Sequence, residues 1–129
     1  MSTPYFSVLV AAYNVDKYLD ECLTSLIQQT YLDAEFIVVD DASTDNTKQI
    51  CEGFAQRDVR FKLVRNEKNE GLLAVRKKAV KMARGQFVVF LDGDDCLAST
   101  EALSQLVECT KEHQADIYRF TVRSFGEDI

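Results

Sequence analysis

Continuous apolar runs alternate with amphipathic segments along the chain. Uninterrupted runs of strand length occupy 6–12, 35–39 and 86–91, and a less apolar run occupies 60–65. Continuous apolarity over such a length is typical of strands that are covered on both faces. The stretch "DIYRFTV" at 116–122 predicts a fifth strand.

The segments between these runs have helical spacing. Over 16–29 the apolar positions recur three and four residues apart, which predicts one amphipathic helix. Similar spacing predicts helices around 50–54 and 103–107 and over 72–83. Gly85 follows the third of these and is suited to end it in a left-handed conformation.

Strands and helices in strict alternation indicate βαβ units. We therefore predict a single α/β domain over residues 1–129, with a doubly wound, mostly parallel sheet and helices on both faces. In such sheets ligands bind outside the carboxyl ends of the strands. Polar residues that directly follow the predicted strands are therefore the candidates for a site.

The charge and composition of the chain argue against some classes of binding partner. The 129 residues include 15 basic and 21 acidic side chains, with a net charge of −6. This balance argues against a nucleic-acid partner or a general membrane-binding surface, since both require clustered Lys and Arg. The four cysteines lack C-x-x-C spacing, which predicts reduced thiols. The N-terminus has no basic leader, so the cytoplasm is the expected compartment.

Three carboxylates stand where the fourth strand is predicted to end. The stretch "FLDGDD" holds Asp92, Asp94 and Asp95. A surface turn needs only one or two such residues, whereas Mg²⁺ is held by one or two carboxylates together with substrate phosphates. A bound cation would offset the mutual repulsion of three acids. We predict a divalent-cation site in this cluster, where one carboxylate can ligate the ion and another can reach a ribose hydroxyl.

A second acidic pair follows the second predicted strand. Asp40 and Asp41 come directly after "FIVV". Asp41 is placed to accept hydrogen bonds from a base or a ribose. Alternatively, Asp41 belongs to the start of the next helix, where Ser43 and Thr44 can act as N-caps. We interpret Asp45 as structural.

Four stretches together resemble the family 2 glycosyltransferases, which have the GT-A fold. They are "SVLVAAYNVDKYLDECLTSLIQQTY" at 7–31, "FIVVDDASTDNT" at 36–47, "NEG" at 69–71 followed by Arg76, and "GQFVVFLDGDD" at 85–95. Each stretch alone is a weak signal, but their order and spacing are specific. The resemblance covers roughly three-quarters of the chain.

The resemblance implies an enzyme that transfers a sugar, with inversion, from a nucleoside-diphosphate sugar such as a UDP-sugar to a glycan or lipid-linked acceptor, using Mg²⁺ or Mn²⁺. By position, the implied substrate-binding residues are Ala11, Tyr13, Asn14, Asp40, Asp41, Arg76, Asp92 and Asp94, and the implied metal ligands are Asp94 and Asp95. Within this set Asp41 contacts the base, Asp40 supports Asp41, and Arg76 can bind the diphosphate with two hydrogen bonds.

The resemblance also implies functional parts of the enzyme that these 129 residues do not include. Family members place the acceptor site and the general base after a further strand, so we expect the base beyond Ile129 and interpret this chain as the donor-binding part of a longer enzyme. A longer chain could carry a membrane anchor that holds the enzyme at the inner face of the membrane, and self-association is open. Where members often carry proline, an amide and glycine, this chain has Ala11, Lys77 and Ala79.

Two alternatives come from other classes. A signalling receiver domain has a similar length and a cation-binding acidic pair, but that pair follows the first strand, where this chain has "AYN". A non-catalytic nucleotide-sugar sensor would share the whole pattern, because a fold does not fix a function.

Overall fold

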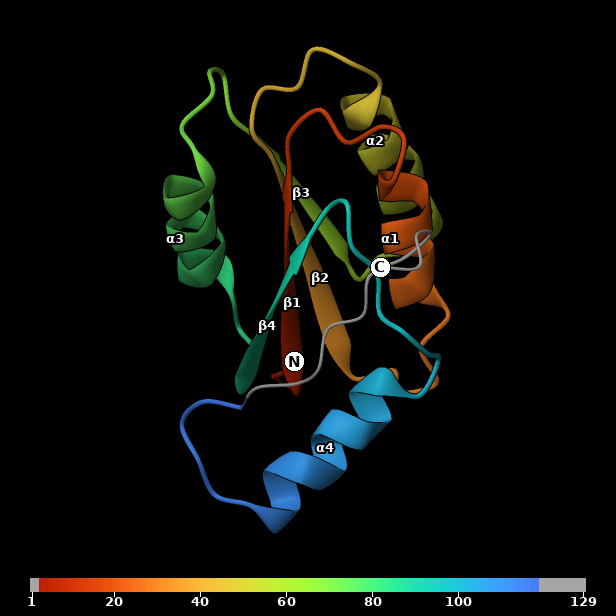
Figure 1. Ribbon diagram of the computed structural model, residues 1–129, viewed down its shortest axis with the longest axis vertical. Coiled ribbons are helices and arrows are strands. Elements are labelled where there is room, and N and C mark those ends of the chain that lie inside the picture. The colour runs from red at the N-terminus through yellow and green to blue at the C-terminus, as the bar shows by residue number, and fades with distance from the viewer. Residues whose placement is uncertain (1–2, 119–129) are drawn as a thin grey trace, which may run out of the picture.

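A computed structural model describes residues 3–118, in which four strands alternate with four helices (Figure 1). In chain order the elements are β1 (Phe6–Ala12), α1 (Leu19–Ile27), β2 (Ala34–Asp40), α2 (Thr47–Arg57), β3 (Phe61–Arg65), α3 (Leu72–Met82), β4 (Phe87–Asp92) and α4 (Ala102–Glu112). This alternation confirms the predicted α/β class.

The four strands form one parallel sheet in the order β3-β2-β1-β4. β1 lies inside the sheet, where Phe6 is opposite Ala34 of β2 and Phe87 of β4. Because all four strands run the same way, the loops that follow them lie at one end of the sheet (Figure 1). The sheet therefore brings together the polar residues that were predicted to share a rim.

Two apolar cores lie on the two faces of the sheet. On one face α1, α2 and α4 pack over the strands, and Phe6, Leu23 and Phe54 belong to this larger core. On the other face α3 is the only helix among the described residues, and it packs Val75 and Ala79 against the sheet (Figure 1). Both faces of the central strands are thus buried, which explains their uninterrupted apolar runs.

The structure departs from the predicted boundaries in three places. α1 begins at Leu19, not at residue 16, because the preceding residues form a turn in which the backbone N–H of Asp16 donates to Asp45 Oδ2 at 3.2 Å. Gly85 is not left-handed; among the glycines of the described residues only Gly71 has a positive φ. Residues 116–118 are not strand, and the remainder of the predicted fifth strand lies outside the described residues.

The four cysteines are free thiols, as predicted. Cys22 and Cys51 are buried, and burial followed by the nearby charge of Asp40 raises the pKa of Cys51 to about 12. Both buried thiols therefore act as apolar core residues. Within residues 3–118 no helix combines the length and the apolarity that a membrane span requires.

Gly85 is required for space. A Cβ added there would lie 2.6 Å from the backbone N of Ser7 and 2.7 Å from the carbonyl carbon of Phe6, both in the strand β1. We expect Gly85→Ala to lower the free energy of unfolding by about 1–3 kcal/mol, because neither backbone atom can move without disturbing the sheet. Urea denaturation measures this loss.

Gly53 offers a matched control for that substitution. It lies inside α2, and a Cβ added there meets no atom within 4 Å. Gly53→Ala should therefore raise the free energy of unfolding by about 0.5–1 kcal/mol, the usual gain from alanine inside a helix. Equal effects at the two positions would contradict the steric explanation for Gly85.

Candidate functional site

A cavity of about 340 Å³ opens at the carboxyl end of the sheet. This volume lies within the range of small-molecule sites in proteins. Its lining residues come from the ends of β1 and β4, from the loops after all four strands and from α3: Ala11, Ala12, Tyr13, Val15, Asp41, Asn69, Gly71, Leu72, Val75, Asp92, Gly93 and Asp94. Five of the residues predicted from the sequence, Ala11, Tyr13, Asp41, Asp92 and Asp94, therefore meet at one cavity.

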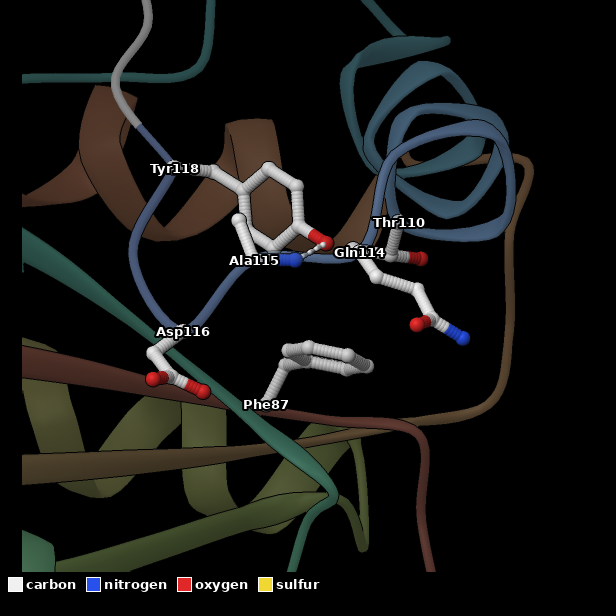
Figure 2. A pocket seen from close by; sticks show the side chains of 6 residues that line it. All are labelled: Phe87, Thr110, Gln114, Ala115, Asp116 and Tyr118. Atoms are coloured by element: carbon white, nitrogen blue, oxygen red, sulfur yellow. Dashed lines mark hydrogen bonds between the residues drawn. The ribbon is translucent and has the colours of Figure 1, made fainter.

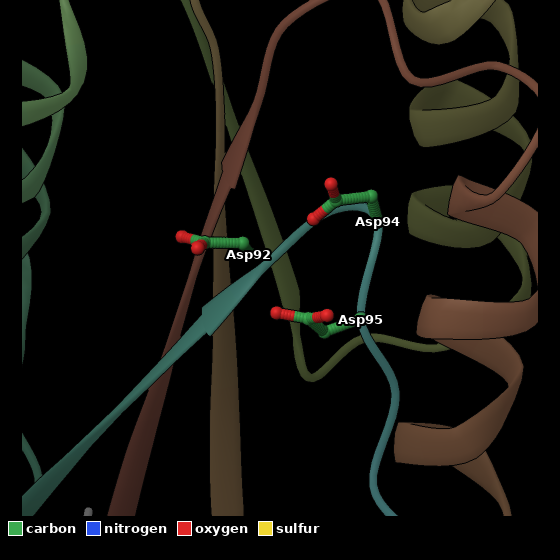
Figure 3. Close-up of side chains that lie close together, drawn as sticks. All are labelled: Asp92, Asp94 and Asp95. Atoms are coloured by element: carbon green, nitrogen blue, oxygen red, sulfur yellow. The ribbon is translucent and has the colours of Figure 1, made fainter. Parts of the chain in front are cut away.

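The three acids at the carboxyl end of β4 form a cluster next to this cavity. Asp92, Asp94 and Asp95 each offer a carboxylate oxygen, and these oxygens all lie within 4.8 Å of one another (Figure 3). Partial desolvation, and then the charges of Asp94 and Asp92, raise the pKa of the Asp95 carboxyl above its usual range. Hard oxygen ligands at this density suit Mg²⁺ or Mn²⁺, so the donor set fits the predicted ion.

Short contacts hold the acidic loop against β1 and α1. The backbone N–H of Gly93 donates to Ala11 O at 2.8 Å, and that of Asp95 donates to Asp92 O at 2.9 Å. A Cβ at Gly93 would lie 2.9 Å from Val15 and 3.1 Å from Ala11 O. Gly93 thus lets the loop fold back tightly, and the carboxylates are positioned before any ligand arrives.

Arg76 lies next to the acidic cluster. Its guanidinium Nη2 is 3.2 Å from Asp92 Oδ1, and it also lies over the ring of Phe90, 5.5 Å from the centroid. Both partners of the ion pair are about 40% exposed, so the pair itself adds little stability. Arg76 does not line the cavity, but the ion pair holds its guanidinium next to Asp92, which does.

Asp41 is buried and fully hydrogen-bonded. Its carboxylate accepts Asn66 Nδ2–H at 2.8 Å and the backbone N–H groups of Glu70 and Gly71 at 2.8 and 2.9 Å. Burial alone would raise the pKa of Asp41, but these three hydrogen bonds and the charge of Lys78 bring it below its usual value. Asp41 therefore stays ionised and ties the loop before α3 to the end of β2.

Two further predicted residues lie behind the cavity. Asp40 is completely buried, and its carboxylate accepts Ser43 N–H at 3.0 Å and Arg65 Nε–H at 3.2 Å. Asn14 has a positive φ of 51°, and its side-chain oxygen accepts Thr44 N–H at 2.8 Å. Neither residue lines the cavity, and both connect the loops that form its wall.

The interpretation of Asp45 as structural agrees with its contacts. Its carboxylate accepts the backbone N–H of Thr47 at 2.9 Å and that of Asp16 at 3.2 Å. These bonds join the start of α2 to the turn before α1.

Sequence reasoning missed the wall that the segment between β3 and α3 contributes. Asn69, Gly71, Leu72 and Val75 line the cavity, and the buried Asn66 holds Asp41. The signal that could have found them is their place after the third strand, since the loop at 66–71 reaches the same rim as the acidic loops.

A larger cavity, of about 440 Å³, lies at the opposite end of β4 (Figure 2). Its lining residues are Phe87, Thr110, Gln114, Ala115, Asp116 and Tyr118. Asp116 is the one acid among them, and none of the predicted site residues is present. We therefore assign the candidate site to the smaller cavity at the carboxyl end of the sheet.

A parallel α/β sheet with an acidic cluster and a cavity at its carboxyl end is typical of domains that bind nucleotides. Comparison with known proteins gives the family: a family model described as glycosyl transferase family 2 matches residues 7–129. The chain belongs to this family, as its four motif stretches predicted.

Known relatives and structures agree with this assignment. The chain is 38% identical to an uncharacterized glycosyltransferase, EpsJ of Bacillus subtilis, over 114 residues, which are 88% of this chain and 33% of EpsJ. A crystal structure of residues 1–349 of TarS from S. aureus in complex with UDP-GlcNAc superposes with a TM-score of 0.81 at 39% identity, covering 87% of this chain and 32% of that TarS fragment. This likeness confirms the predicted GT-A fold.

A more distant structure was solved with a metal ion. The mannosyltransferase PcManGT from Pyrobaculum calidifontis, in complex with GDP-Man and Mn²⁺, has a TM-score of 0.77 at 27% identity, covering 85% of this chain and 33% of PcManGT. The chain thus spans about a third of EpsJ, of the crystallised TarS fragment and of PcManGT.

Proposed function

We propose that this chain forms the nucleotide-sugar-binding part of an inverting, metal-dependent glycosyltransferase, with a UDP-sugar as the donor. The observation that carries the proposal is the meeting of the cavity and the acidic cluster at one end of the sheet. TarS, the more similar of the two solved relatives, was crystallised with UDP-GlcNAc, which supports UDP over GDP.

The chain's own residues suit the three parts of such a donor. Tyr13 and Leu72 are each about half exposed at the cavity and offer apolar surface to a base. Asp41 shapes the wall behind the base, where its ionised carboxylate orients the backbone of Glu70 and Gly71. Arg76 can donate hydrogen bonds to a diphosphate from its place next to Asp92.

Mg²⁺ or Mn²⁺ would be held by Asp94 and Asp95, with Asp92 next to it. Such an ion neutralises the charge that develops on a departing diphosphate. The exposed carboxylates of Asp94 and Asp95 have no ion-pair partner among the described residues. They are therefore available as ligands, whereas Asp92 is shared with Arg76.

We place the general base outside this set, beyond Ile129. The carboxylates that line the cavity are those of Asp41, Asp92 and Asp94. Asp41 is held by three hydrogen bonds, Asp92 by Arg76, and Asp94 belongs to the metal cluster. The acceptor, the oligomeric state and the cytoplasmic location, at the inner face of the membrane for a longer anchored chain, stay predictions.

Isothermal titration calorimetry of the 129-residue chain with UDP tests the proposal. In the presence of Mn²⁺ we expect binding that weakens at least about tenfold, or 1.4 kcal/mol, when the ion is removed with EDTA. GDP and CDP in the same buffer report on the base. A chain that binds no nucleoside diphosphate in Mn²⁺ contradicts the proposal.

The two alternative hypotheses, a receiver domain and a non-catalytic sensor, have different outcomes. Membership of the glycosyl transferase family removes the receiver-domain hypothesis. A non-catalytic sensor would bind UDP in the same way, so radiolabelled sugar transfer by a longer chain is the measurement that separates it from an enzyme.

A further inference from the structure

One segment of the chain has a charge balance opposite to the rest. Residues 72–91 hold five of the 15 basic side chains and none of the 21 acidic ones. Since this segment carries +5 and the whole chain carries −6, the remaining residues carry −11. The chain therefore contains a basic region despite its negative net charge. In the structure this region consists of α3, the residues that follow it and β4.

The basic residues of this segment divide into two groups. Arg76 pairs with Asp92, and Lys78 donates to Glu70, so these two serve the site. Lys77, Lys81 and Arg84 are exposed and form no ion pair with any residue in the described range 3–118. Three cations are thus left at the surface of the molecule.

Apolar side chains lie among these three cations. Leu73 is 70% exposed and Val80 is 45% exposed. On a helix the positions 73, 77, 80 and 81 share one side. That side is opposite Val75 and Ala79, which α3 packs against the sheet. Arg84 is exposed two residues after α3 ends at Met82. We call the set of Leu73, Lys77, Val80 and Lys81, together with Arg84 beyond the end of the helix, the outer surface of α3.

We propose that the outer surface of α3 docks on an anionic lipid bilayer. A helix that presents lysines around exposed Leu and Val, with an exposed arginine just after its end, has the composition of interfacial helices, whose apolar side chains enter the headgroup region while the cations pair with lipid phosphates. Among residues 3–118, α3 is the only helix on its face of the sheet, so no other described helix covers its outer surface (Figure 1). The acidic remainder of the chain is repelled by the same lipids, which orients α3 toward them.

Charge argues against a second copy of the chain as the occupant. A two-fold contact through this surface places the same patch of each copy face to face. Lys77, Lys81 and Arg84 would then meet their own counterparts, and like charges in an interface oppose association. Anionic lipids offer the complementary charge.

Co-sedimentation with vesicles tests the proposal. The 129-residue chain should bind vesicles that contain phosphatidylglycerol, bind phosphatidylcholine vesicles far less, and be released by high salt. The variant Lys77→Gln/Lys81→Gln/Arg84→Gln should bind the anionic vesicles about 100-fold more weakly, because each basic residue near such a surface contributes roughly fivefold.

A control variant removes three positive charges from other parts of the surface. Lys17, Lys48 and Lys111 are exposed on other parts of the molecule, and their triple change to Gln should retain most of the vesicle binding. The variant Leu73→Ser/Val80→Ser keeps the charge and should lose about tenfold in affinity. Circular dichroism and UDP binding should be the same in all three variants, since none of these residues lines the cavity.

Three outcomes overturn the proposal. One is the absence of binding to anionic vesicles at low salt, and another is equal weakening by the two triple variants. The third is concentration-dependent self-association in sedimentation velocity that the α3 variant abolishes, which assigns the surface to a second copy. If the chain binds anionic vesicles but does not bind UDP, the proposed function is contradicted and the docking proposal is not.

Discussion

Replacing Asp94 with asparagine is expected to abolish Mn²⁺-dependent UDP binding and to leave the fold intact. Asparagine keeps the size of the side chain but removes the charge from an exposed member of the acidic cluster, so no core contact is lost. We expect the affinity for UDP in Mn²⁺ to fall about 100-fold, or 2.8 kcal/mol at 1.4 kcal/mol per decade. Calorimetry with and without Mn²⁺ measures both the loss and its metal dependence.

The same charge can be removed at the other end of the sheet. Asp33 is exposed just before β2 begins, so Asp33→Asn changes the net charge equally without touching the cluster. Its UDP affinity should match that of the unchanged chain. If both variants bind UDP equally in Mn²⁺, the acidic cluster does not hold the metal.

Replacing Asp41 with asparagine should reduce both stability and UDP affinity. A neutral amide has one acceptor oxygen where the carboxylate has two, and its N–H₂ group would face the donors of Asn66, Glu70 and Gly71. One or two hydrogen bonds to a charged acceptor are lost, at about 1.5–3 kcal/mol each. Urea denaturation reports the stability, and calorimetry with UDP reports whether the altered wall still fits the nucleotide.

At low pH the difference in stability between the unchanged chain and the Asp41→Asn variant should disappear. The pKa of Asp41 in the folded chain is below the ordinary value of 3.8, so its stabilising contribution is present above that pH and is lost as the pH falls through the folded value. The two proteins should therefore differ most near neutral pH and converge below pH 3.8. Glu67→Gln, on the exposed part of the same loop, should change neither quantity at any pH.

The order of strands and helices could be predicted because burial leaves a direct mark on the sequence. β1 is buried on both faces, so its apolar run is continuous, and α1 is buried on one side, so its apolar positions recur with helical spacing. Because parallel strands all end at the same side of a sheet, the sequence also predicts that Tyr13, Asp41 and Asp92 lie at one end of it.

The partners of each polar side chain could not be predicted in the same way. Asn14 and Asp40 have the types of ligand-binding residues, yet their oxygens accept backbone N–H groups of Thr44 and Ser43. Which donor a side chain meets depends on how two loops distant in sequence approach each other, and no local pattern encodes that approach. Gly85 is another case, since its requirement comes from Ser7, 78 residues earlier in the chain.

The position of β1 has a consequence for synthesis of the chain. β1 is made first, yet one of its two neighbours is β4, and the pair Phe6 and Phe87 is about 80 residues apart in sequence. At a translation rate of roughly 5–20 residues per second, β1 waits on the order of 4–16 seconds on the ribosome before that neighbour exists. During this interval "FSVLVAA" has an unpaired edge and apolar side chains on both faces. The nascent N-terminus is therefore the segment we expect molecular chaperones to bind.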